Sequence, residues 1–479
     1  MEDFLFVLGS NWQLSIAELD NVLKNSQYRG KIKDYSANVA IVEFENLDKN
    51  ETNIKQLEEL QFLLGGCQKI AKIYNFIHNS TIINAFPVKV EKIDLINQAR
   101  NNIAKVLEAV IQAVFPKIDK KRYFYAVSIY PNFYDDEYYS VLIQHALPFL
   151  SKGILSILIQ KGAKKSSSYY KYPEENIKSG KLNPIFPHHV IDYNLLTESR
   201  AEFIFGFTEE GMYIARTFTV DNPNFKKKID EERPFKDFKS SISPKLALIL
   251  LNFLNLFEKR EEKKILDPFI GNGTIALFAI LQDFQIFGAD VDETKVKNTI
   301  RNINWLLKDI EEPIPPFLTE RFKAVDIEHI SDFFSHSSFD GACTEPFLGP
   351  YYTDKPLYTQ AKELIDNDLE PLFNDIFRET YKLLKNKARI CITAPIISTI
   401  NDKNEDKIDG TIEGKNLQLD VNKIALKYKF KPLLFLDSNR IINKSNKRLQ
   451  FNEKHFKNLI DAKKGQILKR KIYLFEKQE

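Results

Sequence analysis

The residues that follow the apolar stretch Lys264–Leu266 have the composition of a ligand-binding turn. Glycine lets the backbone approach a ligand closely, and the free N–H groups where a helix begins can receive a carboxylate. Asp267 could bind an ammonium group on the same ligand, so the turn fits the amino-acid end of a ligand. Neither GxGxxG nor GK[ST] is present, so dinucleotide and P-loop chemistry are not supported. The turn consists of Asp267, Pro268, Phe269, Ile270, Gly271, Asn272, Gly273 and Thr274.

Two further acids follow the next two apolar stretches. Asp290 follows Gln285–Ala289, and an acid at the end of a second strand typically binds a pair of ribose hydroxyls. Asp326 follows the third stretch and could accept a hydrogen bond from an adenine amino group. Each acid alone is more often a turn or cap residue, but three acids after three successive strands, together with the glycine turn, favour a nucleoside pocket. Val291 and Ile327, which follow two of these acids, are further candidate binding residues.

The elements that must position these residues alternate between apolar strands and helices from residue 243 onward. Pro244 is placed to open an apolar helix, because proline is favoured in a first helical turn. Such alternation indicates an α/β domain with a parallel, doubly wound sheet, which binds ligands beyond the carboxyl ends of its strands. The predicted strands are 264–266, 285–289, 321–325, 341–344 and 389–393, and the predicted helices are 274–281, 294–308 and 359–384.

The first 200 residues show a different alternation, which indicates smaller α+β layers. Ser15 followed by Glu18 predicts a capping box at a helix start, and Gly65-Gly66 predicts the end of a second helix over 54–64. The other predicted strands are 4–9, 38–44, 123–130 and 153–160, and the other predicted helices are 98–114 and 138–150.

Composition limits the class of protein. The 479 residues predict two or three domains, and 43% hydrophobic with 28% charged residues indicates a globular chain. No apolar stretch approaches the roughly 20 residues of a membrane helix, so no membrane partner is expected. Cys67, Cys343 and Cys391 are too far apart for a metal or disulfide framework, which favours a reduced, cytoplasmic protein. The net charge of +3 neither requires nor excludes nucleic acid.

The turn Asp-Pro-Phe-x-Gly-x-Gly-Thr resembles the first motif of S-adenosylmethionine-dependent RNA methyltransferases that modify exocyclic amines. Other motifs resemble the tRNA guanine-10 N2-methyltransferase family in particular. This resemblance is strong over 233–395 and depends on short motifs before residue 200. The motifs are Phe6-Val7-Leu8-Gly9, Leu14-Ser15-Ile16-Ala17-Glu18-Leu19, Leu64-Gly65-Gly66-Cys67-Gln68-Lys69-Ile70, Arg233-Pro234, Ser243-Pro244-Lys245-Leu246-Ala247 and Asn252.

The resemblance implies a ferredoxin-like domain over 1–90, a THUMP-like RNA-binding domain over 91–200, a linker over 201–242 and a class I, Rossmann-like methyltransferase domain over 243–479. It implies a tRNA substrate, and whether a small activator protein is an additional partner stays open. The implied cofactor is S-adenosylmethionine, with Pro244, Asp267, Pro268, Phe269, Gly271, Gly273, Thr274, Asp290, Val291, Asp326 and Ile327 as its binding residues.

The fourth strand leads into Thr344-Glu345-Pro346-Phe347-Leu348-Gly349, where the family has Asp-Pro-Pro-Tyr-Gly. When Gly349 is matched to the family's glycine, Glu345 takes the place of the aspartate and Pro346 that of the first proline. An exocyclic amine is a poor nucleophile, and a carboxylate with a nearby backbone carbonyl can accept its protons, while an aromatic ring can stack on a flipped base. Glu345, Pro346 and Phe347 are therefore the candidate catalytic residues, and either Phe347 or Leu348 could contact the base.

Two other functions stay open at this stage. One is a DNA or rRNA amino-methyltransferase acting on adenine N6 or cytosine N4, and the other is a catalytically inactive RNA-binding scaffold. Basic residues are candidates for an RNA surface, since 439–479 has twelve Lys/Arg and four Asp/Glu, and Lys164-Lys165 lie close to Tyr169-Tyr170. His188-His189 has no third ligand at a useful spacing and is not expected to bind metal.

Overall fold

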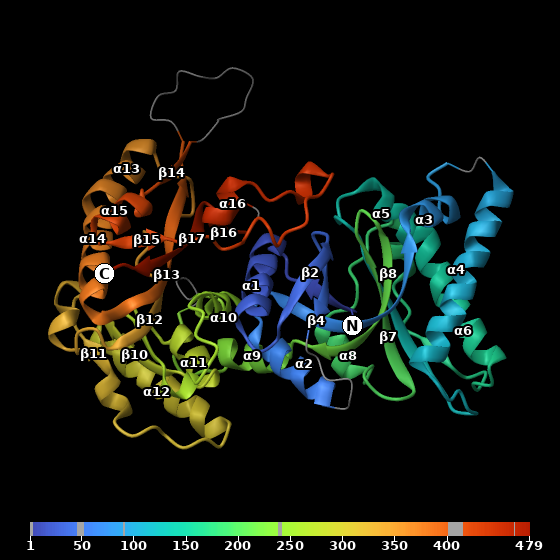
Figure 1. The fold of residues 1–479 in the computed structure, drawn as a ribbon, viewed down its shortest axis with the longest axis horizontal. Coiled ribbons are helices and arrows are strands. Elements are labelled where there is room, and N and C mark those ends of the chain that lie inside the picture. Colours follow the sequence, from blue (N-terminus) through green and yellow to red (C-terminus); the bar gives the residue numbers. More distant parts are fainter. Residues whose placement is uncertain (1–2, 46–51, 90–91, 238–241, 401–414, 464) are drawn as a thin grey trace.

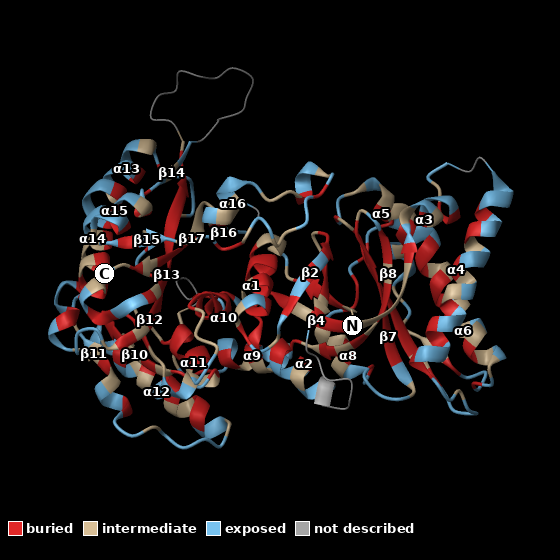
Figure 2. Ribbon diagram, viewed as in Figure 1, coloured by how far each residue is buried: buried red, intermediate tan, exposed pale blue. Residues whose placement is uncertain are grey.

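The computed structural model describes residues 3–45, 52–89, 92–237, 242–400, 415–463 and 465–479. Figure 1 shows two β-sheets that lie side by side along the long axis of the molecule, one from each half of the chain. Figure 2 shows that the strands of both sheets are largely buried, whereas the outer surfaces of the helices are exposed.

Among the described residues, eight strands from the first half of the chain form one continuous sheet, in the order β2-β3-β1-β4-β8-β7-β5-β6. β1 pairs antiparallel with β3 and β4, whereas β5 pairs parallel with β7. The strands are β1 (Asp3–Leu8), β2 (Gly30–Tyr35), β3 (Val39–Phe44), β4 (Cys67–His78), β5 (Phe124–Tyr130), β6 (Ser168–Tyr169), β7 (Arg200–Phe207) and β8 (Gly211–Val220).

The predicted linker over 201–242 is therefore wrong for its first part. β7 and β8 lie in the middle of the sheet, where β8 pairs with β4 and β7 pairs with β5. Most of their residues are buried and the others of β8 are half-buried, which is not expected of a linker. These two strands join the regions 1–90 and 91–200, and the assignment of those regions as ferredoxin-like and THUMP-like domains stays a prediction.

A buried ion pair lies within this sheet. Lys69 on β4 and Glu202 on β7 are fully buried, and Lys69 Nζ lies 2.6 Å from Glu202 Oε1. Ser128 and Thr217 donate further hydrogen bonds to the same carboxylate, and Lys69 also donates to the carbonyl of Ile185. Burial lowers the pKa of Lys69, and the contact with Glu202 opposes that effect. Since breaking a buried pair leaves an uncompensated charge, this pair fixes how β4, β5, β7 and β8 align.

The helices of the first half cover this sheet. The predicted strand 153–160 is wrong, because the chain forms one continuous helix from Glu137 to Gln160, with a π-helical turn over Leu142–Ala146. This helix is long and apolar enough to cross a membrane, but Leu150, Ile154 and Leu158 on one of its faces pack into the core. The helices are α1 (Trp12–Asn25), α2 (Thr52–Leu63), α3 (Asn79–Ala85), α4 (Ile93–Val114), α5 (Glu137–Val141), α6 (Leu147–Gln160), α7 (Glu174–Ser179), α8 (Pro187–Asp192) and α9 (Pro223–Glu231).

The second sheet confirms the doubly wound α/β architecture. Its main path in the described residues is β11-β10-β9-β12-β13-β17-β15, parallel from β11 to β13, with the antiparallel β17 inserted between β13 and β15. The strand order reverses between β9 and β12, where open α/β sheets bind ligands. The strands are β9 (Lys264–Asp267), β10 (Gln285–Asp290), β11 (Phe322–Ala324), β12 (Phe339–Thr344), β13 (Leu384–Ser398), β14 (Asn416–Gln418), β15 (Phe430–Pro432), β16 (Leu459–Asp461) and β17 (Leu468–Lys477).

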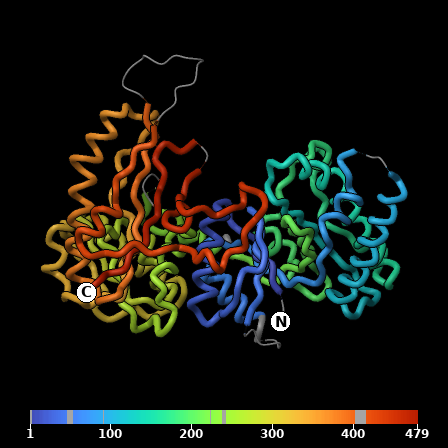
Figure 3. The backbone as a smooth tube through the Cα atoms, turned by 45° about the horizontal axis from the view of Figure 1, so that its top comes forward, coloured from blue at the N-terminus to red at the C-terminus, as the bar shows by residue number. Residues whose placement is uncertain are grey.

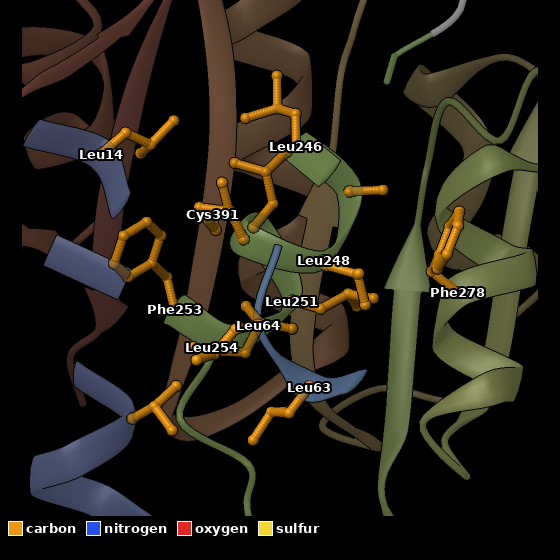
Figure 4. Close-up of a cluster of buried hydrophobic side chains, with 14 of the residues drawn as sticks. Leu14, Leu63, Leu64, Leu246, Leu248, Leu251, Phe253, Leu254, Phe278 and Cys391 are labelled. Atoms are coloured by element: carbon orange, nitrogen blue, oxygen red, sulfur yellow. The ribbon is translucent and has the colours of Figure 1, made fainter. Parts of the chain in front are cut away.

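Helix α10 connects the two halves of the molecule. It begins at Pro244, as predicted, and Ser243 caps it by accepting a hydrogen bond from the backbone N–H of Leu246. Figure 4 shows its apolar side chains between Leu63 and Leu64 of the first half and Cys391 and Phe278 of the second. The helices of the second half are α10 (Pro244–Phe253), α11 (Thr274–Leu281), α12 (Glu293–Asp309), α13 (Tyr358–Glu363), α14 (Glu370–Leu383), α15 (Val421–Lys427) and α16 (Glu453–Lys457).

The predicted capping box of Ser15 and Glu18 is wrong, because α1 begins earlier and Asn11 caps it. Glu18 lies inside the helix and is fully buried. Its carboxylate accepts hydrogen bonds from the backbone N–H groups of Gly65 and Gly66, at 2.8 and 2.7 Å, and from the side-chain amide of Asn252 on α10, at 2.7 Å. Burial raises the pKa of Glu18 to about 7, although these hydrogen bonds act to lower it.

Residues 433–458, the C-terminal arm, leave the second sheet after β15, cross the first half of the chain and return to the second sheet at β16. Arg440 contacts Asp20 at 2.8 Å, Lys444 pairs with Asp34, and Arg448 lies 2.6 Å from Asp135. Figure 3 shows the red arm beside the blue N-terminal elements. Only some of the basic side chains in 439–479 are therefore available to RNA, because these three cations bind carboxylates of the protein itself.

Removing the carboxylate of Glu18 should destabilise the contact between the two halves of the molecule. In Glu18→Ala three donors lose their buried acceptor, and each unsatisfied donor costs about 1–3 kcal/mol, so the free energy of unfolding should fall by at least about 3 kcal/mol. Denaturant unfolding measures this loss. The exposed Glu58→Ala on α2 is the control, and equal stability of the two variants would contradict the role of Glu18.

Candidate active site

A cavity of about 1170 Å³ opens at the carboxyl ends of the parallel strands in the second sheet. Its walls are formed by the turns that follow β9, β10, β11 and β12 and by the beginning of β17. It therefore lies at the point where the strand order reverses.

Most of the predicted site residues line this cavity, but Pro244 and Gly273 do not. Pro244 is buried in the first turn of α10. Gly273 has φ +83°, and a Cβ there would lie 2.8 Å from the side chain of Thr299, so this glycine permits close packing of the turn against α12. The predicted residues in the lining are Asp267, Pro268, Phe269, Gly271, Thr274, Asp290, Val291, Asp326, Ile327, Glu345, Pro346 and Phe347.

The glycine turn after β9 is held open toward the cavity. Gly271 has φ +53°, and a Cβ built there would meet no atom within 4 Å, so free space lies beside its backbone. Residues of α12 support the turn from behind, since Thr299 Oγ1 donates to the carbonyl of Gly271 and Asn302 Nδ2 donates to that of Asn272. Arg233 of the predicted Arg-Pro motif donates to Thr274 Oγ1 at 2.7 Å and fixes the beginning of α11.

Asp290 links the ends of the first two strands. Its Oδ2 accepts a hydrogen bond from the backbone N–H of Gly271, and its Oδ1 accepts one from that of Asp292, both at 3.0 Å. A carboxylate oxygen can accept two hydrogen bonds, so each oxygen of Asp290 retains one further acceptor position. Asp290 is thus held rigidly at the cavity wall and can still accept from a pair of hydroxyls.

Asp267 is almost completely buried at the base of the cavity. Its Oδ1 accepts hydrogen bonds from Thr344 Oγ1 at 2.6 Å and from the backbone N–H of Phe269 at 3.2 Å. Burial, with a smaller contribution from the nearby carboxylates of Asp290 and Glu345, raises the pKa of Asp267 to about 7, although its two hydrogen bonds act to lower it. An acid in this state would be stabilised in its charged form by a cationic ligand.

Two predicted residues lie at the rim of the cavity. Asp326 is exposed, and its side chain accepts from the backbone N–H of Glu328 to begin the short 3₁₀ helix Ile327–Asp332. Val291 is 73% exposed. Both positions leave room for a ligand, and the contact of Asp326 with an adenine amine stays a prediction.

The loop after β12 places Glu345 opposite an arginine from another strand. Arg470 on β17 contacts Glu345 through two atoms, with Nε 2.5 Å from Oε2 and Nη2 3.0 Å from Oε1. Thr393 on β13 donates a weaker hydrogen bond to Oε2 at 3.3 Å. Burial acts to lower the pKa of Arg470, but the contact with Glu345 raises it above its ordinary value.

The two candidate base-contacting residues differ in exposure. Phe347 is 51% exposed and lines the cavity, whereas Leu348 is 8% exposed. The geometry thus favours Phe347 as a stacking surface, while Leu348 is part of the packed wall.

Several residues that shape the site were not predicted from the sequence. Thr299 and Asn302 lie on the helical pattern of α12 and look like ordinary polar positions, and Arg470 lies within the basic run Lys469-Arg470-Lys471. The one available signal for Arg470 is the basic character of 439–479. Within the described residues, no group of three or more His, Cys, Asp or Glu side chains could hold a metal ion.

No protein-family model matches the chain. Over 145 residues it is 26% identical to a tRNA (guanine(10)-N2)-dimethyltransferase of Pyrococcus abyssi, and over 88 residues it is 33% identical to a protein of the same name from Methanothermobacter thermautotrophicus. The resemblance to that family is confirmed. The matched segments cover 30% and 18% of this chain, and 38% and 25% of the relatives' lengths.

Solved structures give more distant matches. TrmN from Thermus thermophilus has a TM-score of 0.48 at 13% identity, with 99% of each chain covered. A predicted N6-adenine-specific DNA methylase from Listeria monocytogenes has a TM-score of 0.42 at 9% identity, with 82% of this chain and 89% of that one covered. These matches are too distant to assign a function.

Replacing Asp290 tests whether it binds ribose hydroxyls. A hydrogen bond to a charged group contributes about 1.5–3 kcal/mol, so Asp290→Ala should lower the affinity for S-adenosylmethionine at least about tenfold. Titration calorimetry measures this affinity, and Glu293→Ala, an exposed change outside the cavity lining, is the control. Wild-type affinity in Asp290→Ala would remove Asp290 from the site.

The raised pKa of Asp267 predicts a pH-dependent affinity. A cationic ligand needs the ionised carboxylate, and a group with a pKa of about 7 is protonated below that pH, so affinity for S-adenosylmethionine should fall about tenfold between about pH 8 and pH 6. Asp267→Asn should bind more weakly and lose this dependence. Calorimetry that shows the same pH dependence in both proteins would assign it to another group.

Proposed function

We propose that this protein is an S-adenosylmethionine-dependent methyltransferase that acts on an exocyclic amine of an RNA base, namely N2 of a guanine in tRNA. The observation that supports this most directly is the set of residues that lines one cavity. It is lined by an open glycine turn with Asp267, by Asp290 on the next strand, and by the loop of Glu345 and Phe347. These groups suit the amino-acid end of a ligand, a ribose, and the amine and face of a base, in that order.

The residues present fit S-adenosylmethionine. The space beside Gly271 can receive a carboxylate on the N–H groups at the start of α11, and Asp267 can bind an ammonium group. Asp290 has acceptor positions left for a ribose. When bound, the cofactor supplies a methyl group activated by a positively charged sulfur, and the carboxylates around the cavity favour such a cation over an anionic ligand.

Glu345 has the properties required of an acceptor for the target amine. An exocyclic amine conjugated with its ring is a weak nucleophile, and hydrogen bonds from its N–H groups to an acceptor increase its electron density at nitrogen. Glu345 Oε1 is the proposed first acceptor, and the backbone carbonyl of Thr344 or Pro346 is the proposed second one. The amine can lose its proton after methyl transfer, so a strong base is not required, and Phe347 can stack on the base.

The choice of guanine N2 in tRNA follows the relatives, whose names give that reaction, and position 10 follows the family resemblance. An RNA substrate is also consistent with the aromatic and basic surface of the first half. Tyr170, His189 and Tyr193 lie in one cluster of rings, and exposed lysines at 164, 165 and 171 lie nearby in sequence.

Mass spectrometry of tRNA nucleosides tests this function. A strain without the gene should lack N2-methylated guanosine at one tRNA position, and the purified protein should restore it with S-adenosylmethionine. Loss of methylated adenosine or cytidine instead would favour the other amine methyltransferases, and unchanged nucleosides with retained RNA binding would favour the inactive scaffold.

Glu345→Gln keeps the shape of the acceptor but removes its charge. We expect the single-turnover methylation rate to fall at least about tenfold with little change in the affinities for tRNA and cofactor, because the interaction strengthens in the transition state. Glu363→Gln, on the exposed side of α13, is the control. A wild-type rate in Glu345→Gln would exclude this role for Glu345.

A further inference from the structure

The contact between Glu345 and Arg470 joins two elements that are distant in sequence. Glu345 follows β12, and Arg470 lies on β17, so strand β13 separates them in the sheet. The side chains are mostly buried, at 10% and 18% exposure, and both line the cavity. A two-atom contact between a guanidinium and a carboxylate fixes orientation as well as distance.

The two carboxylate oxygens of Glu345 accept different numbers of hydrogen bonds. A carboxylate has about four acceptor positions. Oε2 accepts from Arg470 Nε and from Thr393 Oγ1, whereas Oε1 accepts only from Arg470 Nη2 among the described residues. Oε1 is therefore the oxygen that retains an acceptor position for a further donor.

Two further carboxylates interact electrostatically with the pair of Glu345 and Arg470. Asp267 on β9 and Glu345 repel each other electrostatically, and Asp461 on β16 attracts Arg470. Asp267 has no cation in hydrogen-bond contact in the described structure, and its pKa is about 7. Without Arg470, the mostly buried Glu345 carboxylate would lose the cation that contacts it, and loss of a contacting cation disfavours the charged form of an acid.

We propose that Arg470 is a positioning residue for methyl transfer, which holds the Glu345 carboxylate ionised and turned so that Oε1 accepts the hydrogen bond from the target amine. This inference depends on the proposed function, because it assigns a role within that reaction. Arg470 acts through Glu345 and needs no contact with the substrate. Lysine cannot replace it fully, because an ammonium group lacks the planar pair of donors.

The test compares Arg470→Met and Arg470→Lys with the wild-type protein in single-turnover methylation of tRNA over a range of pH. The control is Lys469→Met, which removes a positive charge from the adjacent position of β17 and does not line the cavity. The affinities for tRNA and cofactor and the melting temperature are measured in parallel.

We expect Arg470→Met to lower the rate at neutral pH at least about tenfold, with both affinities within about twofold of the wild type. Its rate should fall at a higher pH than in the wild type when the solution is acidified, because Glu345 would now take up a proton more readily. Added guanidinium ion should restore part of the rate, Arg470→Lys should lie between the two proteins, and Lys469→Met should match the wild type. In a Glu345→Gln background, Arg470→Met should cause little further loss.

Four results would overturn the inference. If Arg470→Met and Arg470→Lys lose rate with no change in the pH profile and no rescue by guanidinium, the role of Arg470 is structural. If the loss appears in tRNA affinity, Arg470 contacts the substrate directly. If Arg470→Met keeps the wild-type rate and pH profile, the inference fails while the proposed function stands. If the wild-type protein transfers no methyl group to tRNA, the proposed function fails and the inference fails with it.

Discussion

The carboxylate of Glu18 is the interaction on which the arrangement of the two halves depends. It binds two adjacent backbone N–H groups of the first half and Asn252 of α10, which packs against the second sheet. Glycine is required at both backbone positions, because a Cβ at Gly65 would lie 2.2 Å from the carbonyl oxygen of Lys245 and one at Gly66 would lie 2.8 Å from Ser15. The surface proposed to bind RNA is thus held at a fixed orientation to the cavity.

The carboxylates of the cavity differ in the groups that compensate their negative charge, and this difference agrees with the different role proposed for each. Asp290 is stabilised by two backbone N–H groups, Glu345 by an arginine, and Asp267 mainly by a hydroxyl and one backbone N–H group. Asp267 has the least compensation, and burial raises its pKa to about 7, so a cationic partner would stabilise its charged form. Glu345, the acid paired with Arg470, is the one proposed to face the target amine. Its role as a charged acceptor does not depend on the cationic cofactor, because the arginine already supplies a positive charge.

The sequence predicted the second sheet and most of the cavity lining because those signals are local. Short apolar strands end in acids, and a glycine turn follows β9, so the shared edge of a parallel sheet brings Asp267, Asp290 and Glu345 together. The predictions fail where contacts between residues distant in the sequence determine the structure. The segment 153–160 is apolar enough for either strand or helix, and only its packing in the core selects helix. The partner of Glu345 is 125 residues away, so no spacing rule identifies Arg470.

Strand β17 has a consequence for how the protein is made. It lies between β13 and β15 and also pairs with β16, yet it is translated after all three. Until residues 468–477 leave the ribosome, β13 has an unpaired edge, Glu345 has no counter-ion, and the second sheet is divided into two parts. The first sheet, complete by residue 220, can fold well before this point. Nascent chains that stall late in synthesis should therefore expose an apolar strand edge, a form of the protein that chaperones bind and that aggregates readily.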